Sequence, residues 1–168
     1  MLNFDKKKIL IYGLGITGVS SYDYLKKKNE IYVFDDNFKN IPKKVKKKII
    51  YLENIIKTNF DFIVISPGIN LRNCTLGNYL KKNKHKIITD LDIFYFENPN
   101  NFKITITGTN GKSTTAKLLY EIFKNSKKDV ILAGNIGLPI LRQNKKSKKT
   151  IFIIEASSYQ IEYSQYFK

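Results

Sequence analysis

The sequence predicts an α/β fold built on parallel sheets, in two successive units. Two features of the 168-residue chain indicate this fold. Short apolar runs, many of them β-branched, alternate with segments of helical periodicity, as in strand–helix–strand units. Two glycine-rich loops each follow such a run and precede a helix. Because several runs are apolar at every position, we expect strands that are covered on both faces of a parallel sheet.

Seven candidate strands lie between the predicted helices and turns. They are Ile9–Tyr12, Ile31–Phe34, Phe62–Ile65, Ile87–Thr89, Ile104–Thr107, Val130–Leu132 and Ile151–Ile154. The polar, turn-forming segment Glu97–Asn101 predicts a domain boundary. We therefore expect one domain at residues 1–97. Residues 98–168 would then be about 70 residues of a second domain, near the lower limit for an independent core, and that domain looks incomplete.

The composition argues against several classes of function. The net charge of +16 invites a nucleic-acid partner, but the chain has only two arginines, and base-reading surfaces rely on arginine. Lysine is abundant together with isoleucine, asparagine, tyrosine and phenylalanine, as expected from a genome poor in G and C. We therefore expect no nucleic-acid binding, and the run Lys43–Lys48 is interpreted as a solvated face. No apolar stretch is long enough to cross a bilayer, so no membrane insertion is expected. A lone cysteine, Cys74, fits a reducing compartment and predicts a cytoplasmic protein.

The first glycine loop, Gly13–Gly18, has the spacing G-x-G-x-x-G. Its glycines allow a tight turn, and the following helix N-terminus offers free N–H groups to a phosphate. Asp35 and Asp36 end the second predicted strand, where a ribose-binding carboxylate belongs. These features indicate a Rossmann-like unit and by themselves favour NAD, while a turn without a ligand is the structural alternative. The turn Ser66–Ile69 ends the third strand at the same sheet edge and is either a ligand contact or an ordinary Pro-Gly turn.

The second glycine loop, Thr107–Thr114, reads Thr-Gly-Thr-Asn-Gly-Lys-Ser-Thr and is the most specific signal in the chain. Its backbone N–H groups can surround phosphates, Lys112 can neutralise their charge, and Ser113 can bind Mg²⁺. Only two residues separate Gly108 from Gly111, fewer than in the usual phosphate loop. The strand–loop–helix context nevertheless predicts binding of a nucleoside triphosphate, within a P-loop-type α/β unit. An NAD dehydrogenase does not need a second loop of this kind, so the pair of loops suggests an enzyme with a nucleotide-linked substrate and ATP.

The two loops together resemble those of the Mur ligases. The similarity is carried by Gly-Leu-Gly-Ile-Thr-Gly at 13–18, Ser-Pro-Gly-Ile at 66–69, the loop at 107–114, Gly-Asn-Ile-Gly at 134–137 and Glu-Ala-Ser-Ser-Tyr-Gln-Ile-Glu at 155–162. Within that family the motifs are most similar to the members that add D-glutamate to UDP-N-acetylmuramoyl-L-alanine. The resemblance implies ATP-dependent formation of an amide bond in peptidoglycan-precursor synthesis. It also implies that the Rossmann-like domain holds UDP rather than NAD.

The resemblance assigns roles to individual residues. Ile16 and Thr17 would lie along the diphosphate, Asp35 and Asp36 near the uracil and ribose, and Gly68 in the same pocket. Asn37 stands where relatives often have arginine. ATP would be bound by Gly108, Thr109, Asn110, Gly111, Lys112, Ser113 and Thr114, and Mg²⁺ by Ser113 and Glu155. Asn135 and Ser157 would contact the UDP-sugar, with Ser158 and Gln160 shaping that site. Lys112, Asn135 and Glu155 are the implied catalytic residues.

The implied reaction proceeds through an acyl phosphate formed on the alanyl carboxylate, which the amine of D-glutamate then attacks. Full-length relatives continue beyond this chain, so we expect a fragment that is inactive alone and a monomer when full length. An NAD-dependent oxidoreductase and a catalytically dead UDP-sugar-binding module remain as alternatives. His85 and Cys74 are expected to have no chemical role. Phe94, Tyr95 and Phe96 are interpreted as core or interdomain packing.

Overall fold

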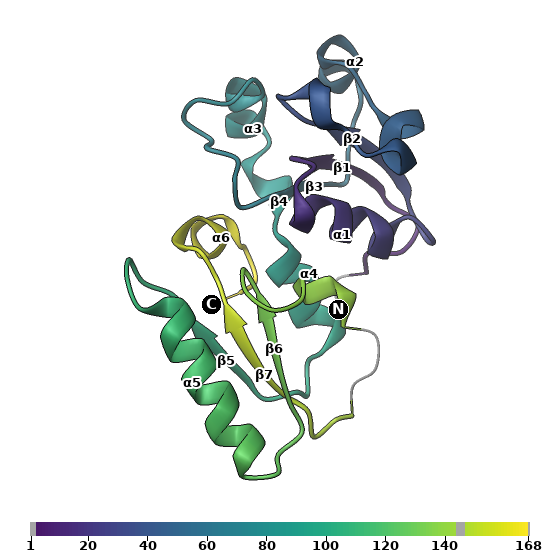
Figure 1. The fold of residues 1–168 in the computed structure, drawn as a ribbon. Coiled ribbons are helices and arrows are strands. Elements are labelled where there is room, and N and C mark those ends of the chain that lie inside the picture. The colour runs from purple at the N-terminus through teal and green to yellow at the C-terminus, as the bar shows by residue number, and fades with distance from the viewer. Residues whose placement is uncertain (1–2, 144–146, 168) are drawn as a thin grey trace.

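The computed structural model describes residues 3–143 and 147–167. Met1, Leu2 and Lys168, at the ends of the two predicted domains, lie outside these ranges. The described chain forms two separate parallel sheets (Figure 1). The first has the order β2-β1-β3-β4 and consists of β1 (Lys8–Tyr12), β2 (Glu30–Phe34), β3 (Phe62–Ile65) and β4 (Ile87–Ile88). The second has the order β5-β7-β6 and consists of β5 (Lys103–Ile106), β6 (Val130–Gly134) and β7 (Ile151–Glu155).

All seven predicted strands are present, with ends that differ by at most two residues. The α-helices are α1 (Ile16–Leu25), α2 (Leu52–Lys57), α3 (Gly77–Lys82), α4 (Asp90–Glu97), α5 (Lys112–Asn125) and α6 (Ser158–Tyr163). Short 3₁₀ helices are η1 (Phe38–Asn40), η2 (Lys43–Lys48), η3 (Lys84–Lys86) and η4 (Ile140–Arg142). In η2 the lysines are exposed and only Val45 is buried, which confirms the solvated face expected there. None of the helices in the described part of the chain is long and apolar enough to span a bilayer.

The first sheet is buried on both faces, as its apolar strands predict. Ile9 and Ile11 of β1 point into one hydrophobic cluster together with Leu25 of α1, whereas Leu10 and Tyr12 point into a second cluster under α2 and α3. These four side chains are fully buried, whereas Lys8, the first residue of β1, is half-buried. Alternate residues of a strand face opposite sides of a sheet, and β1 is an inner strand paired with β2 and β3, so its side chains divide between the two clusters.

The second sheet is less completely covered. Its central strand β7 is buried from Phe152 to Glu155, but both edge strands are mostly half-buried. Helix α5 packs on one face and leaves Leu118 and Ile122 at least half exposed to solvent. The opposite face carries Phe152 and is closed by α4 and η4. Incomplete burial of a three-stranded sheet is expected where no further strand protects either edge.

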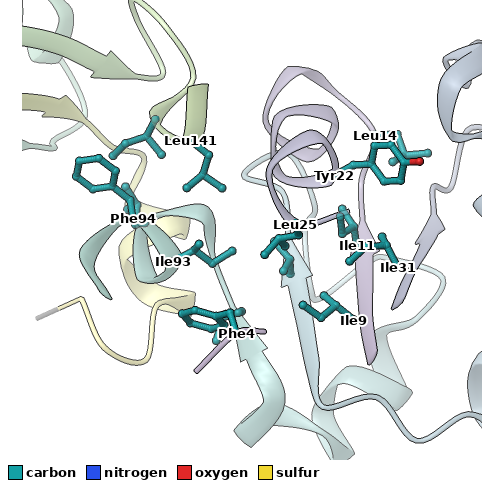
Figure 2. Packing of buried hydrophobic residues seen from close by; sticks show 14 of the residues in the cluster. Phe4, Ile9, Ile11, Leu14, Tyr22, Leu25, Ile31, Ile93, Phe94 and Leu141 are labelled. Carbon is teal, nitrogen blue, oxygen red and sulfur yellow. The ribbon is translucent and has the colours of Figure 1, made fainter. Parts of the chain in front are cut away.

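Helix α4 joins the two sheets through its aromatic side chains. The Phe94 ring meets that of Phe152 edge to face, with 4.9 Å between centroids, and the Tyr95 ring meets that of Phe167 at 4.5 Å. Phe96 packs against Phe4 at 5.7 Å. Figure 2 shows the α4 side of this cluster facing α1. The interpretation of the aromatic triplet as packing rather than as a stacking platform is therefore confirmed.

The N-terminus of α4 also carries a buried carboxylate that holds the end of the described chain. Asp92 is fully buried and accepts from the backbone N–H of Thr89 at 2.8 Å, Tyr166 at 2.9 Å and Phe167 at 3.1 Å. The Thr89 hydroxyl lies 2.6 Å from that of Ser164. These bonds satisfy backbone donors that would otherwise be stranded in an apolar interface, so Asp92 stabilises the contact between the two sheets.

We predict that a neighbouring carboxylate, Asp90, makes stability depend on pH. Burial raises the pKa of Asp90 from 3.8 to about 6, although a hydrogen bond from Gln160 opposes the shift. Between these two values the folded chain holds a proton that the unfolded chain has lost, so stability falls as pH rises. Asp90→Asn cannot ionise, and we expect it to be more stable than the wild type at pH 7 by on the order of 2–3 kcal/mol.

Urea denaturation of both proteins from pH 3.5 to 7.5 measures this difference. The gap between variant and wild type should open between pH 4 and 6 and stay constant above that range. A gap that does not change with pH would show that Asp90 titrates normally.

Candidate functional site

A cavity of about 350 Å³ lies where the carboxyl edge of the first sheet meets the end of β6. Its lining consists of Gly13, Gly15, Ile16, Thr17, Asp35, Ser66, Pro67, Gly68 and Ile69 from the first unit, and Asn135 from the second. Five of the seven predicted substrate residues therefore meet in one place although they come from four distant segments. Asp36 and Ser157 do not line this cavity.

The first glycine loop brings the start of α1 directly against the sheet. Gly13 has a φ of +92°, and its carbonyl oxygen accepts a hydrogen bond from the Ser66 hydroxyl at 2.7 Å. A Cβ on Gly18 would lie 1.8 Å from that same oxygen, so only glycine permits this approach. The N-cap residue is Gly15, which has no side chain that could cap the helix. The first N–H groups of α1 and the positive end of its dipole are consequently available to an anion in the cavity.

The two acidic residues after β2 have different surroundings. Asp35 lines the cavity while accepting from the backbone N–H of Leu14 at 2.5 Å and of Asn37 at 2.8 Å. Asp36 is exposed, and each of its carboxylate oxygens lies 2.7 Å from the Tyr12 hydroxyl. Burial, followed by the bond to Asp36, raises the pKa of Tyr12, so its hydroxyl remains a donor. Asp35 is thus the carboxylate presented to a ligand in this cavity, whereas Asp36 is occupied by Tyr12.

The second glycine loop is exposed and leads into α5. Gly108 and Gly111 have φ values of +142° and +76°, which other residues rarely adopt. Gly111 is the N-cap of α5 and provides no side chain to cap it. The Lys112 ammonium donates to the carbonyl oxygens of Gly108 at 2.5 Å and Thr109 at 3.2 Å, so it lies over the loop. Loop and lysine together present donors and positive charge to the phosphates of a nucleotide.

Glu155 lies on the strand between the one that leads into this loop and the one that leads to Asn135 in the cavity. It ends β7 beside Ile106 and Gly134 in the sheet register, and its backbone oxygen accepts from the N–H of Asn135 at 2.9 Å. A Cβ on Gly134 would lie 2.2 Å from that oxygen, and Gly134 has a φ of +107°. The Glu155 residue is only 4% exposed, yet its Oε2 has no hydrogen-bond partner within the described chain. A buried carboxylate oxygen without a donor is costly unless a cation or ligand satisfies it.

Glu155 and Ser113, the two predicted metal ligands, carry oxygen donors of the kind that suits a hard divalent cation such as Mg²⁺. Such ions take oxygen ligands and usually keep waters and bind substrate phosphates. Ser113, in the first turn of α5, offers a partly exposed hydroxyl. The described residues hold no group of three or more His, Cys, Asp or Glu side chains that could bind a metal by themselves. A cation here would therefore depend on nucleotide phosphates for part of its coordination.

Ser157 caps α6. Its hydroxyl accepts from the N–H of Gln160 at 3.1 Å, while the Gln160 side-chain oxygen accepts from the N–H of Ser157 at 3.0 Å. This reciprocal pair is a capping box, so Ser157 has a structural role at the start of α6. Sequence reasoning missed Asp90, whose carboxylate accepts from the Gln160 side chain at 3.0 Å. Nothing in the local sequence indicates a partner 70 residues away.

A second, larger hollow of about 940 Å³ lies between α3 and the segment that follows α6. Its rim includes several lysines and the exposed His85. Its lining includes Glu162, the last residue of the 155–162 motif, but none of the residues predicted to bind substrate, ATP or metal. The smaller cavity is therefore the candidate site, since there a helix N-terminus, a carboxylate and glycine turns converge.

We predict that Gly18→Ala disrupts this cavity and that Gly15→Ala does not. The Cβ at position 18 would overlap a backbone oxygen, so α1 must move away from the sheet, which should cost about 3 kcal/mol. A Cβ at position 15 meets nothing within 4 Å, and Gly15 has a φ of −66°. Thermal and urea unfolding of both variants measure the difference. Equal stability of the two would contradict the close approach described here.

Two family models match the chain. Residues 7–88 match the Mur ligase MurD-like N-terminal domain, and residues 106–168 match the Mur ligase middle domain. The UDP-N-acetylmuramoylalanine–D-glutamate ligase of Rickettsia felis is 38% identical over 96% of this chain, and that of Buchnera aphidicola subsp. Schizaphis graminum is 40% identical over 95%. The chain spans 36% and 37% of the lengths of these two relatives.

One solved structure has a similar fold. The UDP-N-acetylmuramate:L-alanyl-gamma-D-glutamyl-meso-diaminopimelate ligase from Neisseria meningitides superposes with a TM-score of 0.51 over 90% of this chain and 52% of its own, at 18% sequence identity. That likeness concerns the fold. The two family models and the sequence relatives lead to one conclusion: the chain belongs to the Mur ligase family.

Proposed function

We propose that this chain provides the UDP-substrate pocket and the ATP phosphate loop of a ligase that joins D-glutamate to UDP-N-acetylmuramoyl-L-alanine. Residues 1–97 would form the UDP-binding domain and residues 98–168 the first part of the ATP-binding domain. The observation that carries this proposal is the cavity shared by the first glycine loop and Asn135. The names of the relatives supply the substrate class.

In this proposal the diphosphate lies at the N-terminus of α1, against the backbone of Ile16 and Thr17. The cavity of about 350 Å³ falls within the range of small-molecule sites. Asp35 lies at the edge where the ribose and uracil would bind, and Gly68 allows the substrate to pass close to the backbone. Asp36 would reach the nucleoside only if it exchanged its bond to Tyr12 for one to the ligand. Asn135 would contact the sugar or peptide end from the second unit.

ATP would bind at Gly108–Thr114. Lys112 would exchange its bonds to the Gly108 and Thr109 carbonyl oxygens for bonds to phosphate oxygens, which carry more charge. Ser113 and Glu155 would hold Mg²⁺ beside the phosphates, which gives the unpartnered Glu155 oxygen a cation. When bound, Mg²⁺ supplies Lewis-acid stabilisation of phosphoryl charge.

The proposed chemistry has two steps. An oxygen of the alanyl carboxylate attacks the γ-phosphorus of ATP, ADP leaves, and an acyl phosphate forms. The amine of D-glutamate then attacks the acyl carbon, loses a proton, and displaces inorganic phosphate from a tetrahedral intermediate. Lys112 stabilises the negative charge of the transferring phosphoryl group, and Asn135 orients the substrate between the two sites. We assign no residue of this chain to D-glutamate.

The first test compares nucleotide classes. We expect isothermal titration of the 168-residue chain to detect UDP-N-acetylmuramoyl-L-alanine and UDP, and to detect no NADH at the same concentrations. The reason is that the cavity is completed by Asn135 from the second unit, which suits a long UDP-linked substrate. Preferential binding of NADH would instead favour an oxidoreductase and would remove the basis for this proposal.

The second test separates the two sites. We expect Lys112→Ala to weaken Mg·ATP binding at least about tenfold, and Glu155→Gln to remove the dependence of ATP binding on Mg²⁺. Neither change should alter the affinity for UDP. Lys117→Ala is the matched control, since it removes an exposed lysine of the same helix. Unchanged ATP binding in both Lys112→Ala and Glu155→Gln would favour a UDP-sugar-binding module without catalytic function.

A further inference from the structure

The larger hollow of about 940 Å³, between α3 and the segment after α6, carries an excess of positive charge. Figure 1 shows α3 and α6 on the same side of the molecule, one in each unit. The charged and titratable side chains in its lining are Arg72, Lys81, Lys82, Lys84, His85 and Glu162. Because arginine and lysine are cationic at neutral pH, positive charges outnumber the single carboxylate here whatever the state of the histidine.

The protein does not neutralise this charge from within. Arg72 and the three lysines of the hollow are exposed. Among the described residues, ion pairs are made by other lysines, namely Lys8, Lys26, Lys28 and Lys44. Like charges gathered in a concave surface focus the field and attract counter-ions from solution. The hollow therefore favours an anion as its occupant.

The floor of the hollow, formed by its less exposed lining residues, is apolar. Leu80 and Ile87 are buried there, and Leu71 and Tyr163 are half-buried. The volume of about 940 Å³ falls within the range of small-molecule sites. Apolar side chains below and cations around the rim suit a ligand that has a hydrophobic body and acidic groups. Arg72 adds a planar guanidinium, which can bind a carboxylate or phosphate through two hydrogen bonds.

Hydrogen bonds between the two units hold the walls of this hollow in place. The Gln165 Nε2 donates to the carbonyl oxygen of Lys84 at 2.9 Å. The hydroxyls of Ser164 and Thr89 lie 2.6 Å apart. Both pairs join the first unit to the segment after α6. The hollow thus exists before a ligand enters, and less free energy is lost to ordering of the protein on binding.

We propose that this hollow binds a small organic anion with an apolar, ring-sized body and at least two negative charges, carried by carboxylate or phosphate groups. The inference goes beyond the proposed function and does not depend on it, because the hollow shares no lining residue with the substrate cavity. It assigns Arg72 and the three lysines to the acidic groups, and the apolar floor to the body of the ligand.

Three probes test this chemistry. Naphthalene-1,4-dicarboxylate and 1-naphthyl phosphate share one ring system and differ in the acidic group, so the tighter of the two identifies that group. Succinate carries two carboxylates without the rings. We expect the tighter naphthalene compound to bind at least about tenfold more strongly than succinate, because its rings cover the apolar floor.

Titration of the 168-residue chain, followed by ¹H–¹⁵N NMR, gives the affinity and the place of binding together. We expect the backbone amides of α3, η3 and residues 162–165 to shift and to saturate at one ligand per chain. For a naphthalene compound the Kd should lie below about 1 mM.

The two arginines of the chain provide a matched pair of variants. Both are exposed, so neither Arg72→Ala nor Arg142→Ala should impair folding. Arg72→Ala should weaken binding about fivefold, whereas Arg142→Ala, which removes the same charge outside the hollow, should change it less than about 1.5-fold. Glu162→Gln removes the carboxylate of the hollow and should strengthen binding about twofold.

Several results would overturn the inference. Shifts centred on residues 13–18 or 108–114, with α3 unchanged, would place the anion at a glycine-rich loop instead. Equal losses in Arg72→Ala and Arg142→Ala, or no gain in Glu162→Gln, would show that binding follows the net charge of the chain alone. Succinate binding as tight as that of the naphthalene compounds would show that the apolar floor does not contact the ligand.

Discussion

The apolar contact between α1 and the pair α4 and η4 is the constraint on which the rest of the arrangement depends. Buried side chains from α1, α4, η4 and β7 form one continuous cluster across the two sheets. Phe94 meets Phe152 in this cluster, and Leu141 of η4 lies on the same side of Figure 2 as Ile93. Burial of such large side chains contributes on the order of 2 kcal/mol each. This packing sets the carboxyl end of β6 beside that of β1.

The apolar contact between α1 and the pair α4 and η4 also holds the two glycine-rich loops in place relative to each other. The polar side chains of the site can act together only because of this placement. Asn135 can line the first cavity only because β6 ends next to it. Glycines at 18 and 134 then allow backbones to approach to distances that any side chain would forbid. The charges of the site suit a nucleotide with its metal ion. The N-termini of α1 and α5, which no side chain caps, and Lys112 attract phosphates. The buried Glu155 oxygen, which has no partner in the described chain, attracts a cation. Buried carboxylates on α4 then fasten the α6 region to the first sheet.

Much of this could be predicted from sequence, for identifiable physical reasons. Strands such as β1 are apolar at every position because both faces are covered, and the glycine spacing of each loop reflects a steric requirement that is local in sequence. Two hydrogen bonds between residues far apart in the sequence could not be predicted. Asp36 bonds to Tyr12, a partner on a different strand, and Asp90 bonds to Gln160 from a distant helix. At the sequence level Asp90 and Asp92 simply look like acidic residues in the first turn of a helix, and only the fold reveals their partners.

A crystal structure of the chain with UDP-N-acetylmuramoyl-L-alanine tests the central claim most directly, namely that the two units share one substrate site. The account predicts the diphosphate against the backbone of Ile16 and Thr17, and the sugar–peptide end within hydrogen-bonding distance of Asn135. Binding of the ligand in the hollow between α3 and α6, or in the first unit with no contact to Asn135, would contradict it.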